Sequence, residues 1–283
     1  MARFKVFIEY EGTRYSGWQA QSNARTVQGE LLRAMRNVFK TDNIELYGSG
    51  RTDAGVHALE QVAHLEVKSV LAPEIIRMKV NDDLPADINL LEVEKASPQF
   101  HARHDAVGRS YLYQISRRRT AFGKRYVWWI KDRIDFQSMV RVSRLFIGMQ
   151  DLRSFTDDDP ADKSTTVKIE GLEMTEHGDL ILMRIVGSHF IWKLVRRIVG
   201  TLVEVGRGTL TMDQVKEFIK HPSDAPSRWT APPSGLFLEK VYFGGESPLP
   251  ALRPAFPVSS NTPESDSRRI NQSLSARNHS DAE

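Results

Sequence analysis

The sequence contains no cysteine, and this absence excludes several kinds of protein. Without thiols, the 283 residues hold neither a disulfide framework nor a thiolate metal centre. The absence also fits a reducing compartment. No apolar run is long enough to cross a membrane, and the opening MARFKVFIEY lacks the apolar core of a signal peptide. We therefore expect a cytoplasmic protein with no membrane-spanning segment.

The sequence also lacks a strong net charge. Its 39 basic and 36 acidic residues leave a formal charge of +3, which does not by itself indicate a polyanionic partner. The location of the basic residues therefore matters more than their number. Residues 247–283 are rich in Pro and Ser and show no apolar periodicity, so we expect them to form a disordered tail.

Apolar residues follow the periods of strands and helices through residues 1–246. Residues 1–105 and 106–246 each show the order strand, helix, strands, helix, strand, which predicts two similar α+β halves. Each half should form a mostly antiparallel sheet with helices on one face. Strands are expected at 4–10, 44–47, 61–67, 89–93, 111–115, 167–173, 180–186 and 236–243, and helices near 27–40, 73–81, 136–146, 190–205 and 211–220, with caps at Thr26, Asp135 and Thr211.

A glycine-rich segment, Gly48–Gly55, is the most unusual part of the sequence. Its glycines predict a tight turn or a close backbone approach. A phosphate-binding loop is an alternative, although the Gly-Lys-Ser/Thr sequence and the dinucleotide spacing are missing. If the segment is extended, Arg51 and Asp53 point the same way and form a charge pair. A neighbouring guanidinium favours the ionised carboxylate, which suits a nucleophile better than a general acid.

The sequence GRTDAGVHA at residues 50–58 resembles the motif of the tRNA pseudouridine synthase A (TruA) family. Further motifs of that family follow in order, and the resemblance extends over residues 4–243. They are Tyr10-Glu11-Gly12, Gly17-Trp18-Gln19, Thr26-Val27-Gln28, NDDLPAD at 81–87, Phe100-His101-Ala102-Arg103, Tyr111-Leu112-Tyr113, Phe190, VRRIVG at 195–200, Ala231-Pro232-Pro233 and Gly235-Leu236.

The resemblance implies two similar α+β halves with an active-site cleft between them. It also implies a homodimer that needs no cofactor and no metal. Enzymes of this family isomerise uridine to pseudouridine at positions 38, 39 and 40 in the anticodon stem-loop of tRNA. Asp53 matches the catalytic aspartate, Arg51 and Arg196 the arginines beside it, Tyr111 the tyrosine that packs on the target base, and Leu236 an apolar residue that lines the pocket.

The reaction breaks the bond from N1 to C1′, rotates the base and rejoins it through C5. A carboxylate can attack the sugar or the base, or remove a proton from the sugar, and the sequence leaves these routes open. A second group must remove the C5 proton, and Tyr111 is a candidate for this step. The target base must also leave its stack, which costs a few kcal/mol. Aromatic stacking, worth about 1–3 kcal/mol per base, can offset that cost.

Two groups of basic residues are candidates for contacts with RNA phosphates. His189, Lys193, Arg196 and Arg197 share one face of the expected helix at 190–205. The second group follows the strand that carries Tyr111 and comprises Arg117, Arg118, Arg119, Lys124 and Arg125. A solvated surface without RNA is the alternative in both cases.

Other features carry competing interpretations. His101, His104 and Asp105 resemble a metal-binding set, but their stretch is expected to be a loop. Asp157-Asp158-Asp159 would repel phosphate, so this acidic loop either faces away from RNA or holds a hydrated cation. Two other functions compete with the synthase: a non-catalytic RNA-binding protein of the same fold, and a phosphate-binding metabolic enzyme that uses the glycine-rich segment.

Overall fold

The computed structural model describes residues 1–245 and 250–258 and confirms the α+β class. The first half contains β1 (Ala2–Tyr10), α1 (Val27–Phe39), β2 (Ile44–Gly48), β3 (His57–Val67), α2 (Pro73–Asp83) and β4 (Ile88–Lys95). The second half contains β5 (Gly108–Ser116), β6 (Trp128–Trp129), α3 (Phe136–Ser143), β7 (Gly148–Asp151), β8 (Thr166–His177), β9 (Leu180–Gly187), α4 (Leu194–Arg207), α5 (Met212–Lys220) and β10 (Leu236–Tyr242).

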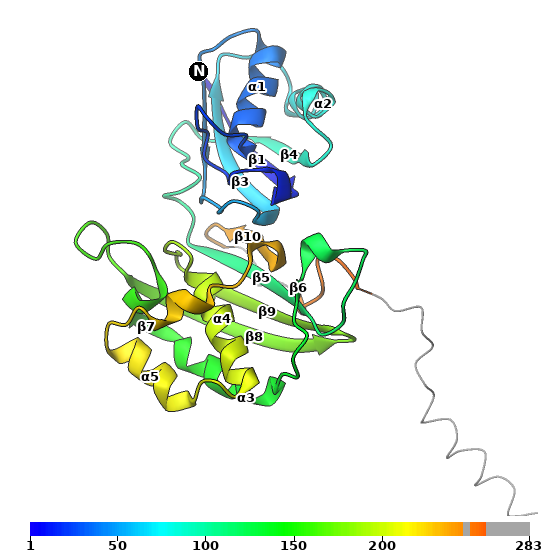
Figure 1. The fold of residues 1–283 in the computed structure, drawn as a ribbon. Helices are drawn as coiled ribbons and strands as arrows, with labels where there is room; N and C mark the ends of the chain where they lie inside the picture. The colour runs from blue at the N-terminus through cyan, green and yellow to red at the C-terminus, as the bar shows by residue number, and fades with distance from the viewer. Residues whose placement is uncertain (246–249, 259–283) are drawn as a thin grey trace, which may run out of the picture.

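One sheet of ten strands joins the two halves of the described chain (Figure 1). The strand order is β4-β1-β3-β10-β5-β9-β8-β7, with β2 paired to β3 and β6 to β5. The last strand, β10, lies between β3 of the first half, in parallel, and β5 of the second, antiparallel. Because β3 begins directly after the glycine-rich segment, this arrangement places that segment at the junction of the halves.

The helices of both halves lie on the same face of the sheet, as expected. Cross-strand pairs carry this face across the junction from Tyr10 through Ala58 and Leu238 to Tyr111. All four side chains belong to one hydrophobic core that extends through both halves. Because this close-packed core continues across the junction, it holds the two halves in one arrangement.

Side-chain caps set the starts of three helices, as the sequence predicts. Thr26, Asp135 and Thr211 each accept a hydrogen bond from a backbone amide in the first turn. Helix α4 has no such cap, and Lys193 precedes it in the left-handed conformation. The expected helix at 190–205 is therefore wrong at its start, because α4 begins four residues later. The short strands β6 and β7 were also not predicted, since neither shows an alternating apolar pattern.

The expected disordered tail is wrong for residues 250–258, which we call the strap. Leu252 of the strap packs into a small second core on the opposite face of the sheet, beside Leu112, Leu182 and Phe237. Gln114 secures the strap, because its amide accepts from the backbone of Ala255 at 2.6 Å. The Pro- and Ser-rich composition of residues 247–283 predicted disorder. The strap is ordered because its few apolar residues pack against an apolar face of the sheet. Residues 246–249 and 259–283 lie outside the described part of the chain.

The strap gives a testable expectation for stability. A chain that ends at Gly245 should lose roughly 2–4 kcal/mol of unfolding free energy, because Leu252 and several strap hydrogen bonds are lost. The melting temperature should fall by roughly 5–10 °C. A chain that ends at Val258 is the matched control and should melt like the full chain. Equal melting temperatures for the two truncations would mean that the strap contributes nothing to stability.

Among the described residues, no helix is both long enough and apolar enough to cross a membrane.

Candidate active site

The glycine-rich segment forms a loop whose backbone is held by the rest of the first half. Amide groups at both ends of the segment donate to backbone oxygens of the protein, so they are not available to a phosphate. The bonds run from Ser49 N to Val62 O at 2.7 Å, from Gly55 N to Tyr15 O at 3.2 Å and from Val56 N to Asp53 O at 3.1 Å. The last of these closes a turn that starts at Asp53. The loop therefore serves to present that residue.

Two glycines of the opening segment allow close packing against the same loop. A Cβ at Gly12 would lie 1.9 Å from Val56 O, and one at Gly17 would lie 2.6 Å from Thr52 O. Gly17 also has a φ of +88°, which L side chains rarely adopt. Any side chain at these positions would displace the loop. These contacts give the Tyr10-to-Gln19 motif a structural reason to accompany the motif that contains Asp53.

Asp53 meets Arg196 across the junction of the halves. Arg196 Nη1 donates to Asp53 Oδ2 at 3.0 Å, and Arg196 Nε donates to Ala231 O at 2.7 Å. The side chains are 24% and 15% exposed, so the pair is shielded but still accessible. Among the described residues, no group donates to Asp53 Oδ1. One carboxylate oxygen is thus fixed, and the other is available to a reactant.

The packing around α4 explains the position of Arg196. A Cβ at Gly200 would lie only 1.4 Å from Trp229 O, so only glycine lets the segment that ends at Ala231 approach the helix. The backbones of Ala231 and Arg196 are also hydrogen-bonded at 3.0 Å. The glycine of the VRRIVG motif therefore supports the arginine one turn before it.

The expected Arg51–Asp53 pair is wrong. Arg51 is exposed, and the ion pairs of the described residues include none between it and Asp53. The turn closed by Val56 directs the Asp53 carboxylate toward α4, which lies far away in the sequence. Arg51 stays at the surface of the loop, where it is available to an external anion.

Tyr111 lies at the centre of the sheet, in β5 between β10 and β9. The Phe190 ring meets it edge-on, with 4.8 Å between ring centroids. Burial raises the pKa of the Tyr111 phenol to about 12, the nearby Arg109 guanidinium opposes the rise, and Asp53 adds to it. Because β5 pairs with β10 at the junction of the halves, Tyr111 lies in the region where Asp53 meets Arg196.

Leu236, the first residue of β10, is buried beside the same constellation. It pairs in register with Tyr113, and Leu238 pairs with Tyr111, so all four side chains share the face that α4 covers. The structure thus brings Asp53, Arg196, Tyr111 and Leu236 to the junction of the halves, whereas Arg51 remains on the exposed side of the loop.

Arg109 supports the site, although no motif in the sequence indicates it. This guanidinium is only 8% exposed, and burial lowers its pKa. It donates to Ser49 O at 2.9 Å, Ser49 Oγ at 3.0 Å, Arg103 O at 3.1 Å and Ser188 O at 3.2 Å. No described carboxylate forms an ion pair with it. Arg109 therefore ties the loop of Asp53 to the linker between the halves and to the segment before α4.

His57 connects the loop to a second segment. Its Nδ1 accepts from Gly12 N at 3.0 Å, and its Nε2 lies 2.9 Å from Arg125 O, so Nε2 carries the proton. Burial lowers the pKa of His57, which keeps the ring neutral. We conclude that His57 positions the backbone and does not transfer protons.

Two carboxylates of the acidic loop, residues 157–159, neutralise basic residues of the protein itself. Asp157 accepts from Arg197 and, at 2.6 Å, from Lys193, while Asp158 accepts from Lys163 at 2.9 Å. No group of three or more potential metal ligands occurs among the described residues. The hydrated-cation alternative therefore has no support. The expected basic face of α4 is also wrong, because Arg197 is buried and both it and Lys193 are paired.

The other basic group divides into paired and unpaired residues. In the basic loop, residues 117–125, Arg117 pairs with Glu176 and Arg118 with Asp179. Arg119, Lys124 and Arg125 are exposed and take part in no ion pair within residues 1–245 and 250–258. These three cations are the ones available to phosphates.

The suspected metal set is a structural cluster of rings. His101 Nδ1 accepts from the backbone amides of Arg103 and His104, so that nitrogen is occupied. His101 also contacts the rings of His64 and His104, with centroids 4.6 and 4.2 Å apart. The arrangement fixes the linker between the halves.

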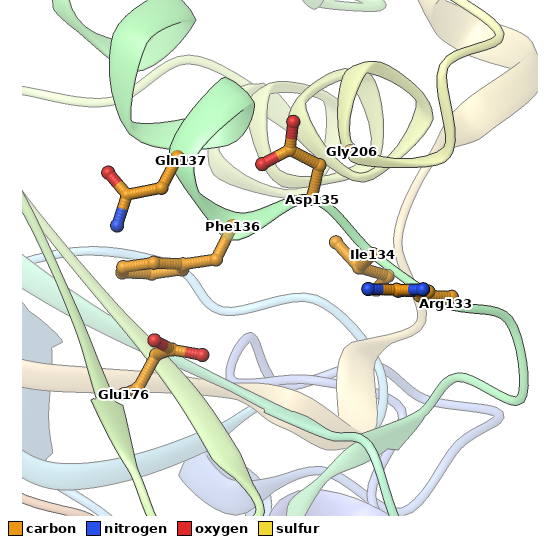
Figure 2. Close-up of a pocket in the computed structure, with 7 residues that line it drawn as sticks. All are labelled: Arg133, Ile134, Asp135, Phe136, Gln137, Glu176 and Gly206. Carbon is orange, nitrogen blue, oxygen red and sulfur yellow. The ribbon is translucent and has the colours of Figure 1, made fainter.

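A surface pocket of about 510 Å³ lies elsewhere, between α3, α4 and β8 (Figure 2). Asp135 lines it, but its carboxylate caps α3 through Ser138 N. Neither Asp53 nor Arg196 contributes to this pocket. It therefore offers no alternative centre for the chemistry considered above.

Comparisons with known proteins identify the family of the chain. The family described as tRNA pseudouridine synthase matches residues 6–105 and 142–244. A tRNA pseudouridine synthase A of Geobacillus sp. (strain WCH70) is 37% identical over 245 residues, 85% of this chain and 98% of the relative. That of Fervidobacterium nodosum is 38% identical over 247 residues, covering 86% of this chain and 100% of the relative. The family match ends at residue 244, before the strap.

Proposed function

Because the chain belongs to the tRNA pseudouridine synthase A family, and is thus an isomerase that converts uridine to pseudouridine in tRNA, we propose that it acts on the anticodon stem-loop, at positions 38, 39 and 40, with Asp53 as its catalytic residue. The family assignment sets aside the non-catalytic RNA-binding alternative. The same assignment argues against the phosphate-binding metabolic enzyme.

The geometry of Asp53 carries the proposal. Attack on the sugar, attack on the base and removal of a sugar proton all require a carboxylate oxygen that faces the nucleoside. Arg196 holds Oδ2 of Asp53 at 3.0 Å, and Oδ1 lacks a described donor. A fixed carboxylate with one open oxygen is suited to each route, because orientation lowers the barrier before any bond changes.

The other site residues have distinct proposed roles. Tyr111 supplies an aromatic face for the base that has left its stack, and Leu236 supplies an apolar wall. Arg196 positions Asp53, whereas the exposed Arg51 binds a phosphate near the target nucleotide. We place these groups in a cleft between the halves.

Mapping of pseudouridine tests the proposal directly. tRNA from cells with and without this protein should differ at positions 38, 39 and 40, and the purified protein should restore those sites in vitro. Restoration at other uridines only would contradict the anticodon stem-loop assignment. We also propose, from the family resemblance, a cytoplasmic homodimer that needs no cofactor or metal; sedimentation and activity after chelation test this.

The basic loop gives an expectation for salt dependence. Replacement of Arg119, Lys124 and Arg125 together by Ala should reduce the slope of log affinity against log salt by roughly 2 units, because each lost phosphate contact removes about 0.7. Arg117→Ala is the control, since Arg117 is paired with Glu176 and should change the slope little. Filter binding of tRNA over a range of salt concentrations measures both. An unchanged slope for the triple variant would place the RNA elsewhere.

A further inference from the structure

Trp192 is a large aromatic residue that the protein core does not use. Trp192 is 50% exposed, whereas Trp18 is only 1% exposed. Trp192 lies in the segment that joins β9 to α4, just before the helix begins. Trp is enriched at interfaces because its ring is apolar and its N–H is polar, so this indole is a candidate for contact with an external partner.

Two residues close to Trp192 in the sequence contact residues of the candidate active site. Phe190, two residues earlier, contacts the ring of Tyr111, and Arg196, four residues later, binds Asp53. Because only a few residues separate these two anchors, the backbone of Trp192 lies near the site. It is not part of the constellation that holds Asp53.

Ion pairs hold the backbone of Trp192 in place. Its amide donates to Asp158 Oδ2 at 2.8 Å, and Asp158 is itself held by Lys163. Lys193, the next residue, has a φ of +62°, a conformation disfavoured for a residue with a side chain. Its ammonium bonds Asp157 and lies 4.5 Å from the centroid of the Trp192 ring. The acidic loop thus holds the backbone that carries the exposed indole.

We propose that Trp192 is a stacking platform for an unpaired nucleobase of the RNA, adjacent to the uridine that enters the site. This inference rests on the proposed function and adds a second binding position to it. An aromatic plane binds a splayed base by its face without reading the sequence. The ammonium of Lys193 lies beside the ring and is held there by Asp157. Asp157 and Asp158 of the acidic loop are paired with cations of the protein itself, which weakens their repulsion of phosphate.

Substitution of Trp192 separates stacking from folding. With an unmodified tRNA transcript as substrate, Trp192→Ala should raise KM by about tenfold and leave kcat within about threefold, because stacking supplies binding. Trp192→Phe keeps a ring and should recover most of the loss. Met149→Ala removes another exposed apolar side chain, on β7, and serves as the control with unchanged KM. An unchanged KM in the Ala variant would overturn the proposal.

A spectroscopic measurement distinguishes a contact with RNA from an effect on structure. Binding of the transcript should quench tryptophan fluorescence, and Trp192→Phe should abolish most of this quenching at saturating RNA. Equal quenching in the two proteins would contradict the platform. So would a change in sedimentation of Trp192→Ala without a change in KM, since the residue would then contact a second copy of the chain. Failure of the proposed function is separate: the wild-type protein would then form no pseudouridine.

Discussion

Asp53→Asn should abolish pseudouridine formation while the protein still folds and binds tRNA. The substitution nearly preserves the size of the side chain but removes its negative charge, and a neutral amide is a poor nucleophile and a poor base. Arg196 should remain in place, because its Nε still donates to Ala231 O. Phosphate contacts and stacking supply the affinity, so tRNA binding should be unchanged or slightly stronger after loss of an anion. Three measurements on one variant suffice: melting temperature, tRNA affinity and pseudouridine yield.

A surface carboxylate provides the control for this experiment. Asp42 pairs with Arg36, and its side chain is 97% exposed, so Asp42→Asn removes the same charge without touching the site. It should retain wild-type turnover and melting temperature. A folded Asp53→Asn variant with turnover comparable to that control would show that Asp53 is structural, and the central assignment would be wrong.

The second large effect concerns Tyr111, where two substitutions should diverge. Tyr111→Phe keeps the ring and should retain turnover within about tenfold, because stacking on the base is preserved. Tyr111→Ala should lose about a hundredfold or more, since it removes the ring and leaves a cavity in the core that costs about 3–5 kcal/mol. Single-turnover rates and melting temperatures of both variants separate the loss of chemistry from the loss of stability.

The pKa of Tyr111 decides which outcome we expect. Burial raises this pKa to about 12, so the phenol is protonated at neutral pH and is not a ready base for the C5 proton. A raised phenol pKa means that the phenolate forms only as the pH rises toward that value. If Tyr111→Phe nevertheless stops release of tritium from C5-labelled uridine, the hydroxyl is the terminal base and the stacking assignment is incomplete.

The sequence predicted most local elements and named the residues of the candidate site. Capping residues such as Thr26 and Thr211 act through amides a few positions away, so their effect follows from local sequence. The motif containing Asp53 also identified the family, because many short motifs follow one another in a fixed order. These features depend on neighbours in the chain and can be found without coordinates.

Only the tertiary structure decided which charges meet. The sequence predicted that Asp53 pairs with nearby Arg51, but its partner is Arg196, a residue of the other half. The sequence also predicted a basic face on α4. That prediction was wrong because Asp157, from another loop, pairs with Arg197 and Lys193. An ion pair depends on distance in space, and periodicity along the chain does not contain that distance.

The strap and Arg109 show the same limit for packing. The composition of residues 250–258 indicated disorder, since nothing in it reveals the apolar sheet face that Leu252 covers. Arg109 had no motif of its own, yet the fold surrounds it with carbonyl oxygens from three segments. The sequence by itself determined most of the helices and strands and identified Asp53 as the candidate catalytic residue. The tertiary structure alone decided what holds Asp53 in place, because its support comes from residues that are distant in the chain and adjacent only after the sheet has formed.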